Sequence, residues 1–175
     1  MTRANPLARA RKVRLLIVDV DGVLTDGRIV LSSGGDELKF FDVKDGFGLV
    51  LARQAGWKTA LITAEKTAVV AARAKRLKID WVAQHARDKA PALRRCLAHF
   101  RIPAEEAAYI GDDLLDLPVL ARVGFAASPA DAHPEARRIA HYVAKKAGGR
   151  GAVREIIDFI LRAQGRWPGI LQRYA

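Results

Sequence analysis

Residues 13–27 have the sequence VRLLIVDVDGVLTDG, an apolar run that ends in two aspartates and a glycine. Such a run, polar only at its end, is typical of a parallel strand buried on both faces. Asp19 and Asp21 are two residues apart, and because side chains alternate along a strand we expect both carboxylates on one side. Gly22 permits a tight turn that leaves backbone amides free to contact an anion. This stretch therefore predicts a strand that presents acidic groups at one edge of a sheet.

The rest of the chain alternates between strand patterns and helix patterns. Further strands are expected over 57–63, 80–83, 107–110, 125–127 and 139–143, and helices over 45–55, 65–77, 87–100, 114–122 and 151–163. This alternation predicts an α/β fold, a doubly wound, mostly parallel sheet with right-handed crossovers. One element interrupts the alternation: 28–31 and 37–41 flank a glycine turn, which is typical of a β-hairpin flap.

The length of 175 residues predicts a single domain over 1–175. Its core is expected over about 13–163, followed by a C-terminal tail over about 164–175 that shows no pattern of its own. The named strands and helices fill the intervals between the predicted strand ends. No room remains for a separate cap domain.

Composition narrows the class of protein. The formal charge is +11, from 30 Lys+Arg against 19 Asp+Glu, which fits either nucleic acid or the steering of anionic substrates. Few aromatics alternate with the basic residues, so we expect no specific nucleic-acid partner. No apolar run reaches ~18 residues, so no membrane partner is expected. The lone Cys96 excludes an internal disulfide framework and fits a reducing cytoplasm.

Polar residues follow four of the predicted strands. In open α/β sheets ligands bind at the carboxyl ends of the strands. The residues expected at that edge are Asp19 and Asp21, then Thr63, then Lys89 at the start of a helix, and then Asp112 and Asp113 in GDDLLD. All the groups that suit a phosphate therefore fall at the same edge.

These residue types suit phosphate-ester hydrolysis, which is very slow uncatalysed and needs both charge neutralisation and a positioned nucleophile. A carboxylate can attack phosphorus to give an aspartyl-phosphate, which water then cleaves. Of Asp19 and Asp21, one can attack while the other donates a proton to the leaving oxygen. Mg²⁺ held by aspartate oxygens removes the repulsion between carboxylates and substrate. Thr63 and Lys89 can hold the remaining phosphoryl oxygens.

The four segments, in this order, resemble the four motifs of the haloacid dehalogenase superfamily over about residues 13–160. FDVKDGFG, YIGDDLLDLPVL, ADAHPEA and AGGRGAVREI further resemble the 3-deoxy-D-manno-octulosonate 8-phosphate phosphatase family. The resemblance implies a capless, haloacid dehalogenase-like fold, a Mg²⁺ cofactor and a role in lipopolysaccharide biosynthesis. It also implies that Asp19 is the nucleophile, that Asp21 is the acid/base, and that the metal ligands are Asp19, Asp21 and Asp112.

The same resemblance implies a homotetramer whose neighbours close each active site. A capless site in a lone subunit would be open to water. The hairpin at 28–41 is the natural element to reach a partner subunit. We therefore expect a homo-oligomer, a tetramer by the resemblance.

Two positions depart from the octulosonate pattern. Its motif two usually has Thr-Gly-Arg where this chain has Thr63-Ala64-Glu65, and it usually has arginine where Lys44 stands. With glutamate at this position, the segment resembles that of relatives that act on 2-keto-3-deoxynonulosonate 9-phosphate. A nine-carbon substrate therefore remains the alternative to the eight-carbon one. The candidate substrate-binding residues are Lys44, Glu65, Lys66, Arg73 and Arg150.

Several assignments stay open at this point. Asp113 and Asp116 either support the metal site or cap the helix that follows. Arg150, in a glycine-rich segment, belongs either to a flexible helix start or to a segment that closes a neighbour's site. Two other classes share some of these features: a phospho-receiver signalling domain, which also uses aspartates, a threonine and a lysine, and a basic nucleic-acid binder or nuclease.

Overall fold

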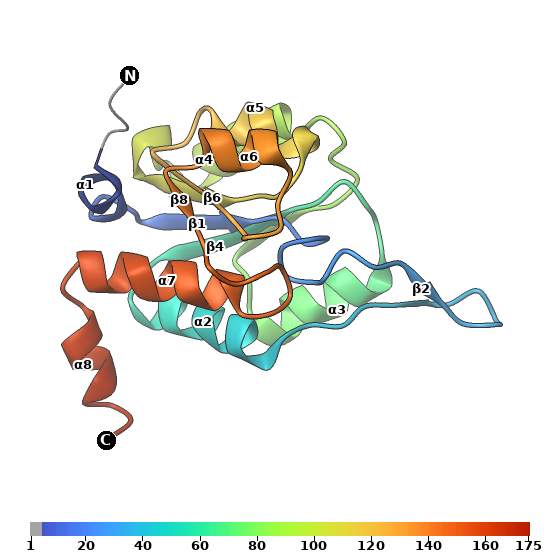
Figure 1. The fold of residues 1–175 in the computed structure, drawn as a ribbon, viewed down its shortest axis with the longest axis horizontal. Helices are drawn as coiled ribbons and strands as arrows, with labels where there is room; N and C mark the ends of the chain where they lie inside the picture. Colours follow the sequence, from blue (N-terminus) through green and yellow to red (C-terminus); the bar gives the residue numbers. More distant parts are fainter. Residues whose placement is uncertain (1–4) are drawn as a thin grey trace.

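A six-stranded parallel sheet forms the centre of the protein in the computed structural model, which describes residues 5–175 (Figure 1). The strands are β1 (Leu15–Val18), β4 (Lys58–Ile62), β5 (Trp81–Ala83), β6 (Ala107–Ile110), β7 (Phe125–Ser128) and β8 (Tyr142–Val143). Their order is β5-β4-β1-β6-β7-β8, and every neighbouring pair is parallel. The predicted fold class is confirmed. The strand order reverses beside β1, which is where open α/β sheets bind ligands.

Helices cover both faces of the sheet (Figure 1). One face carries α2 (Val43–Gln54), α3 (Ala68–Leu77) and α7 (Ala152–Ala163), and the other carries α4 (Lys89–Phe100), α5 (Leu117–Leu120) and α6 (Pro134–Ile139). Side chains that alternate along β1 contribute to two hydrophobic cores, one on each face of the sheet. Leu16 and Val18 belong to one buried cluster and Leu15 and Ile17 to the other. Since both faces of β1 are apolar and buried, the strand reads as a continuous hydrophobic run.

The predicted hairpin is present but shorter than expected. β2 (Val30–Leu31) pairs antiparallel with β3 (Glu37–Leu38), so the ladder occupies only the middle of 28–41. The hairpin projects from the body on the side away from both chain ends (Figure 1). It is the one long insertion between β1 and α2, so no cap domain interrupts the described chain.

The packed core extends beyond the predicted 13–163 at both ends. A short helix α1 (Pro6–Ala10) buries Ala10 completely, and α8 (Trp167–Leu171) buries Ile170 in the tail where no pattern was expected. Each helix has five residues, too few for helical periodicity to show in the sequence. Gln164 joins the two ends, because its Nε2 donates to the Val13 carbonyl and its Oε1 accepts from Trp57 Nε1. In the described part of the chain, no helix is long and apolar enough to cross a membrane.

Candidate active site

Three aspartates meet at the carboxyl edge of the sheet. Asp19 directly follows β1, while Asp112 and Asp116 follow β6. One carboxylate oxygen from each lies within 4.8 Å of the others. Parallel pairing of β1 with β6 brings the two segments together, since Val18 faces Ile110 in the register. The site is therefore a direct consequence of the sheet's central pair.

A buried lysine from the other side of β1 completes this centre. Lys89 opens α4, where the Asp88 carboxylate accepts from the Ala90 amide and caps the helix. Only 2% of the Lys89 side chain is exposed, and its Nζ lies 2.9 Å from Asp19 Oδ2 and 2.6 Å from Asp116 Oδ1. The Lys89 ammonium group is thus shared between two carboxylates, Asp19 and Asp116, that would otherwise repel each other. Burial lowers the pKa of Lys89, but Asp19 and Asp116 outweigh it and the net shift is upward.

The electrostatics of the cluster favour a bound cation. Burial, followed by the charge of Asp116, raises the pKa of Asp19 to about 8 and that of Asp112 to about 7. Asp19 Oδ1 is buried and has no hydrogen-bond partner among residues 5–175. A buried carboxylate oxygen without a partner is costly unless something electropositive contacts it. The donor set, oxygens of Asp19 and Asp112, is the kind that Mg²⁺ prefers.

Asp116 holds the cluster in shape. Its Oδ1 accepts from Lys89 Nζ and from the Tyr109 hydroxyl, the latter at 2.5 Å, and its Oδ2 accepts from the backbone amides of Asp112 and Asp113. Asp113 itself caps the turn that follows, because its carboxylate accepts from the Leu114 amide. Asp116 therefore lies in the acidic centre, whereas Asp113 takes the capping position.

Asp21 is not one of the three clustered aspartates but belongs to the turn that follows β1. β1 ends at Val18, and the chain then turns so that the Val20 carbonyl accepts from the Leu24 and Thr25 amides. The strand has therefore ended before Asp21, so strand alternation does not decide on which side of the chain its carboxylate lies. The Asp21 carboxylate is outside the acidic cluster of the described residues, and its predicted metal contact has no support from that cluster.

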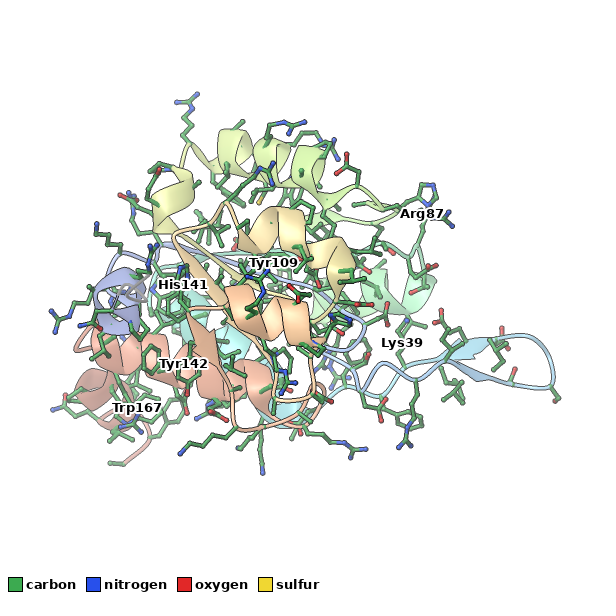
Figure 2. The ribbon with its side chains drawn as sticks, turned by 45° about the horizontal axis from the view of Figure 1, so that its top comes forward. Lys39, Arg87, Tyr109, His141, Tyr142 and Trp167 are labelled. Atoms are coloured by element: carbon green, nitrogen blue, oxygen red, sulfur yellow. The ribbon has the colours of Figure 1, made fainter. Side chains whose placement is uncertain are left out.

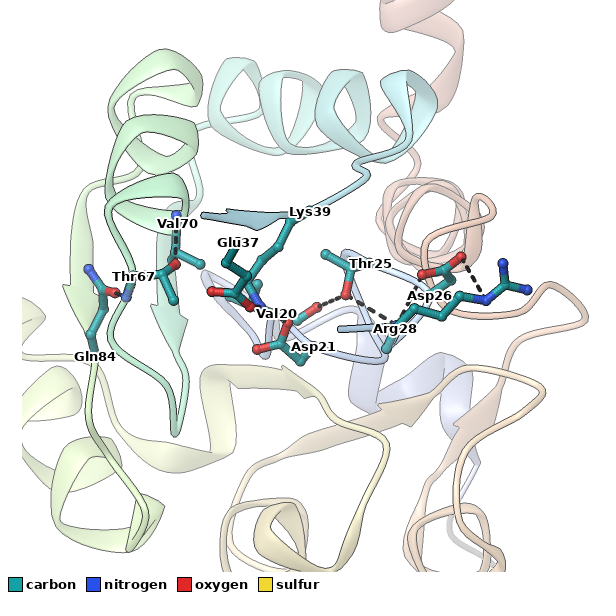
Figure 3. Close-up of polar contacts among 11 residues, drawn as sticks. Val20, Asp21, Thr25, Asp26, Arg28, Glu37, Lys39, Thr67, Val70 and Gln84 are labelled. Carbon is teal, nitrogen blue, oxygen red and sulfur yellow. Dashed lines mark hydrogen bonds and ion pairs between the residues drawn. The ribbon is translucent and has the colours of Figure 1, made fainter. Parts of the chain in front are cut away.

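A lysine of the hairpin pairs with Asp21 instead. Figure 3 shows Lys39 between Asp21 and Glu37, and its Nζ is 2.5 Å from Asp21 Oδ1 and 2.8 Å from Glu37 Oε1. The Lys39 side chain is only 3% exposed although it belongs to the hairpin segment. In Figure 2 it lies where the hairpin meets the body. The hairpin is thus tied to the turn after β1.

Thr63 and Gly22 occupy tight positions at the same edge. Thr63 follows β4 and is buried, and its carbonyl accepts from the Ala86 amide. Gly22 has φ 79°, and a side chain there would overlap the carboxylate of Asp112. The predicted need for glycine at this turn is therefore explained by both its conformation and its close neighbour.

The candidate substrate-binding residues do not form one group. Lys44, Glu65 and Lys66 are exposed. Arg73 is held over the Phe41 ring at 5.2 Å. The remaining candidate, Arg150, lies 3.3 Å from Asp26 Oδ2 and lines a cavity of about 400 Å³ at the base of the hairpin.

Two residues of the site escaped the sequence reasoning. Lys39 stands on a predicted hairpin strand, where an alternating lysine reads as solvent-exposed. Tyr109 stands in the apolar strand AAYI, where a tyrosine reads as core. The sequence did hold a signal for Tyr109, which stands two residues before the GDD motif. A buried tyrosine needs a hydrogen-bond partner for its hydroxyl, and the aspartates that follow could provide one.

Comparison with known proteins places this arrangement in context. Residues 58–157 match the model of the haloacid dehalogenase-like hydrolases. The chain is 45% identical over 163 residues to the 3-deoxy-D-manno-octulosonate 8-phosphate phosphatase of Escherichia coli strain K12, which covers 93% of this chain and 87% of that protein. The phosphatase of the same name from Yersinia pestis is also 45% identical over 163 residues, with the same coverage.

Solved structures agree with the sequence matches. A crystal structure of 3-deoxy-D-manno-octulosonate 8-phosphate phosphatase from Moraxella catarrhalis, in complex with a magnesium ion, a phosphate ion and a KDO molecule, has a TM-score of 0.95 at 38% identity, covering 97% of this chain and 98% of that one. The structure of the phosphatase from Yersinia pestis has a TM-score of 0.92 at 44% identity, covering 94% and 89%.

Proposed function

We propose that this chain, which belongs to the 3-deoxy-D-manno-octulosonate 8-phosphate phosphatase family of the haloacid dehalogenase-like hydrolases, hydrolyses that sugar-acid phosphate with Mg²⁺ as its cofactor. The observation that carries the proposal is the buried Asp19 Oδ1, which has no hydrogen-bond partner among the described residues while Oδ2 of the same carboxylate is fixed by Lys89. Lys89 thus positions Oδ2, while Oδ1 has no partner within the described chain, so the carboxylate can contact both a cation and a phosphoryl group.

Asp19 and Asp112 would hold the Mg²⁺ ion. The bound ion supplies positive charge that offsets the repulsion between these carboxylates and the phosphoryl group. Burial, followed by the charge of Asp116, raises the pKa of both carboxyls, and a bound cation would oppose both effects. Lys89 is already engaged with Asp19 and Asp116, so it cannot neutralise all three aspartates alone.

Asp19 acts as the nucleophile in this proposal. Its carboxylate oxygen forms a bond to phosphorus, the bond from phosphorus to the sugar oxygen breaks, and Asp21 gives that oxygen a proton. Asp21 then takes a proton from water as the water attacks the aspartyl-phosphate, which releases phosphate and restores Asp19. Lys89 and Thr63 hold phosphoryl oxygens through both steps, and only 6% of Asp19 is exposed.

The hairpin supports a homo-oligomer, for which we propose a tetramer. Ile29, Leu31 and Phe40 are 77%, 65% and 66% exposed on a segment that projects from the body (Figure 1). Large apolar side chains clustered on one projecting element mark a contact surface. A neighbouring subunit at the hairpin would also cover the capless site. We further propose a cytoplasmic location and a step in lipopolysaccharide biosynthesis.

A nine-carbon substrate, 2-keto-3-deoxynonulosonate 9-phosphate, is the second candidate. Glu65 favours it, because an exposed carboxylate two residues after Thr63 cannot bind the substrate's carboxylate but can accept hydrogen bonds from additional hydroxyls. The positive charge for the carboxylate would then come from one of the basic candidates, Lys44, Lys66, Arg73 or Arg150.

Phosphate release from a panel of monophosphates tests the proposal. The panel holds the eight-carbon and nine-carbon sugar-acid phosphates, simple sugar phosphates and nucleotides, each with Mg²⁺ and with EDTA. We expect the highest kcat/KM for the eight-carbon acid and none in EDTA. Preference for the nine-carbon acid would select the second candidate, and full activity in EDTA would contradict the metal model.

A further inference from the structure

Asp116 lies in the acidic centre, yet all of its bonding capacity is taken by the protein. A carboxylate has about four lone-pair sites. Asp116 uses two on Oδ1, for the Tyr109 hydroxyl at 2.5 Å and Lys89 Nζ at 2.6 Å, and two on Oδ2, for the amides of Asp112 at 2.8 Å and Asp113 at 3.1 Å. None remains for a cation.

Asp19 contrasts with Asp116 in this respect. Its Oδ1 is equally shielded from solvent but has no partner among residues 5–175. Oxygens of Asp19, Asp112 and Asp116 nevertheless lie within 4.8 Å of one another, so distance alone would admit all three as ligands. The hydrogen bonds, rather than the spacing, separate the ligands from the supporting carboxylate.

Of the four donors, the tyrosine is the one that side-chain substitution can remove without removing a charge. The two amides belong to the backbone of the segment after β6, and Lys89 is required beside Asp19. Tyr109 is fully buried in β6, and burial together with Asp116 keeps its pKa well above the ordinary value, so the phenol remains a donor.

We infer that Tyr109 is a positioning residue that keeps Asp116 out of the coordination shell of the cation and keeps Lys89 shared between Asp116 and Asp19. The inference rests on the proposed Mg²⁺ site and deepens it. Without the hydroxyl, Asp116 Oδ1 has a free lone pair that faces the cluster. The site then offers three carboxylates instead of two, and Lys89 is drawn toward Asp116 and away from the nucleophile.

Calorimetric titration of metal-stripped protein with Mg²⁺ and with Ca²⁺ tests this inference without any substrate. Ca²⁺ accepts six to eight oxygen ligands in flexible geometry, whereas Mg²⁺ retains waters and takes one or two carboxylates. An added carboxylate should therefore favour Ca²⁺. For Tyr109→Phe we expect the ratio of the Ca²⁺ Kd to the Mg²⁺ Kd to fall by about tenfold or more, the gain expected from one charged ligand contact.

Tyr142→Phe is the matched control. Tyr142 also donates its hydroxyl to a carboxylate, Glu155 Oε1 at 3.0 Å, but Glu155 is not part of the acidic cluster. In Tyr142→Phe, the ratio of the Ca²⁺ Kd to the Mg²⁺ Kd should stay within about twofold of the wild-type ratio. That change is well below the effect of one hydrogen bond to a charged group. A melting curve checks that Tyr109→Phe is folded. If the folded variant also keeps the wild-type ratio of the Ca²⁺ Kd to the Mg²⁺ Kd, the inference is overturned.

Asp116→Asn gives an independent answer if Tyr109→Phe does not fold. The inference requires Asp116→Asn to weaken Mg²⁺ binding much less than Asp112→Asn does, since Asp116 is not a ligand. Equal losses in the two variants would overturn it. Failure of wild-type protein to bind Mg²⁺, or to release phosphate, would instead count against the proposed function.

Discussion

Three carboxylates around one lysine make the centre of the site sensitive to pH. Burial first, and then Asp116, raises the pKa of Asp19 to about 8 and that of Asp112 to about 7. Without metal, the folded protein therefore keeps protons that the unfolded chain has released above about pH 4. Stability from these groups is present at low pH and is lost as pH rises through the folded pKa values.

Mg²⁺ binds the ionised carboxylates, so its stabilising effect should increase over the same range. We expect the rise in Tm on adding Mg²⁺, relative to EDTA, to be larger at about pH 8.5 than at about pH 6. Asp45, whose pKa burial raises to about 6, affects both curves alike and cancels in the difference. A Tm difference independent of pH would show that these carboxylates do not bind the ion.

Glu65 should decide between substrates of different length. Placing an arginine there supplies a planar cation for the sugar acid's carboxylate. Glu65→Arg should change the ratio of kcat/KM between the eight-carbon and nine-carbon acids by roughly ten- to a hundredfold, as one charged hydrogen bond does. Glu65→Gln, which keeps an acceptor, should have a smaller effect. A ratio within twofold of wild type for Glu65→Arg would mean that the residue does not contact the substrate.

Residue-level chemistry was only partly predictable from the sequence. Apolar runs that end in polar residues predicted which side chains lie at the carboxyl edge of the sheet. This pattern placed Asp19, Thr63, Lys89 and Asp112 there. The pairing of Lys39 with Asp21 did not follow, because it depends on how a hairpin folds back onto a turn. Neither pattern nor spacing encodes that long-range contact.

Helix α7 illustrates how one element depends on another. Its N-cap residue is Gly151, with φ 97° and no side-chain acceptor of its own. The missing acceptor comes from α2, where the buried Asp45 carboxylate accepts from the Gly151 amide at 3.1 Å and from the Arg154 amide at 2.8 Å. Asp45 therefore caps a helix more than a hundred residues away in the sequence.

Asp45→Ala should destabilise the protein by about 1–3 kcal/mol, because it leaves buried amides at the start of α7 without an acceptor. Asp158→Ala is the control: Asp158 pairs with Arg154 on the partly exposed side of the same helix, and its loss should cost no more than about 0.5 kcal/mol. Urea unfolding curves measure both. If Asp45→Ala and Asp158→Ala lower the free energy of unfolding by the same amount, Asp45 does not cap α7.

The boundaries of the longer elements followed from periodicity to within a few residues. The predicted helix at 87–100 is α4 over Lys89–Phe100, and the predicted strand at 57–63 is β4 over Lys58–Ile62. The tail was missed because α8 has only five residues and is held by packing rather than by its own pattern. Short elements depend on tertiary contacts that local sequence does not specify.

At the scale of the whole molecule, the hairpin is the feature that a single chain leaves unexplained. Leu31→Asp, at a 65% exposed position on β2, should weaken assembly and lower activity together if neighbours cover the site. Leu171→Asp is the control, since Leu171 is 54% exposed on α8 at the other end of the molecule (Figure 1). Light scattering at the assay concentration measures the mass. A fully active monomer would contradict the proposed assembly.

The central claim is that Asp19 takes the phosphoryl group from a sugar-acid phosphate. Acid quenching of the enzyme during turnover of ³²P-labelled 3-deoxy-D-manno-octulosonate 8-phosphate with Mg²⁺, followed by peptide mapping, tests it most directly. We expect an acid-stable, base-labile label on the peptide that contains Asp19, and neither label nor phosphate release in Asp19→Asn. Rapid phosphate release from Asp19→Asn, or a label on another residue, would contradict the account.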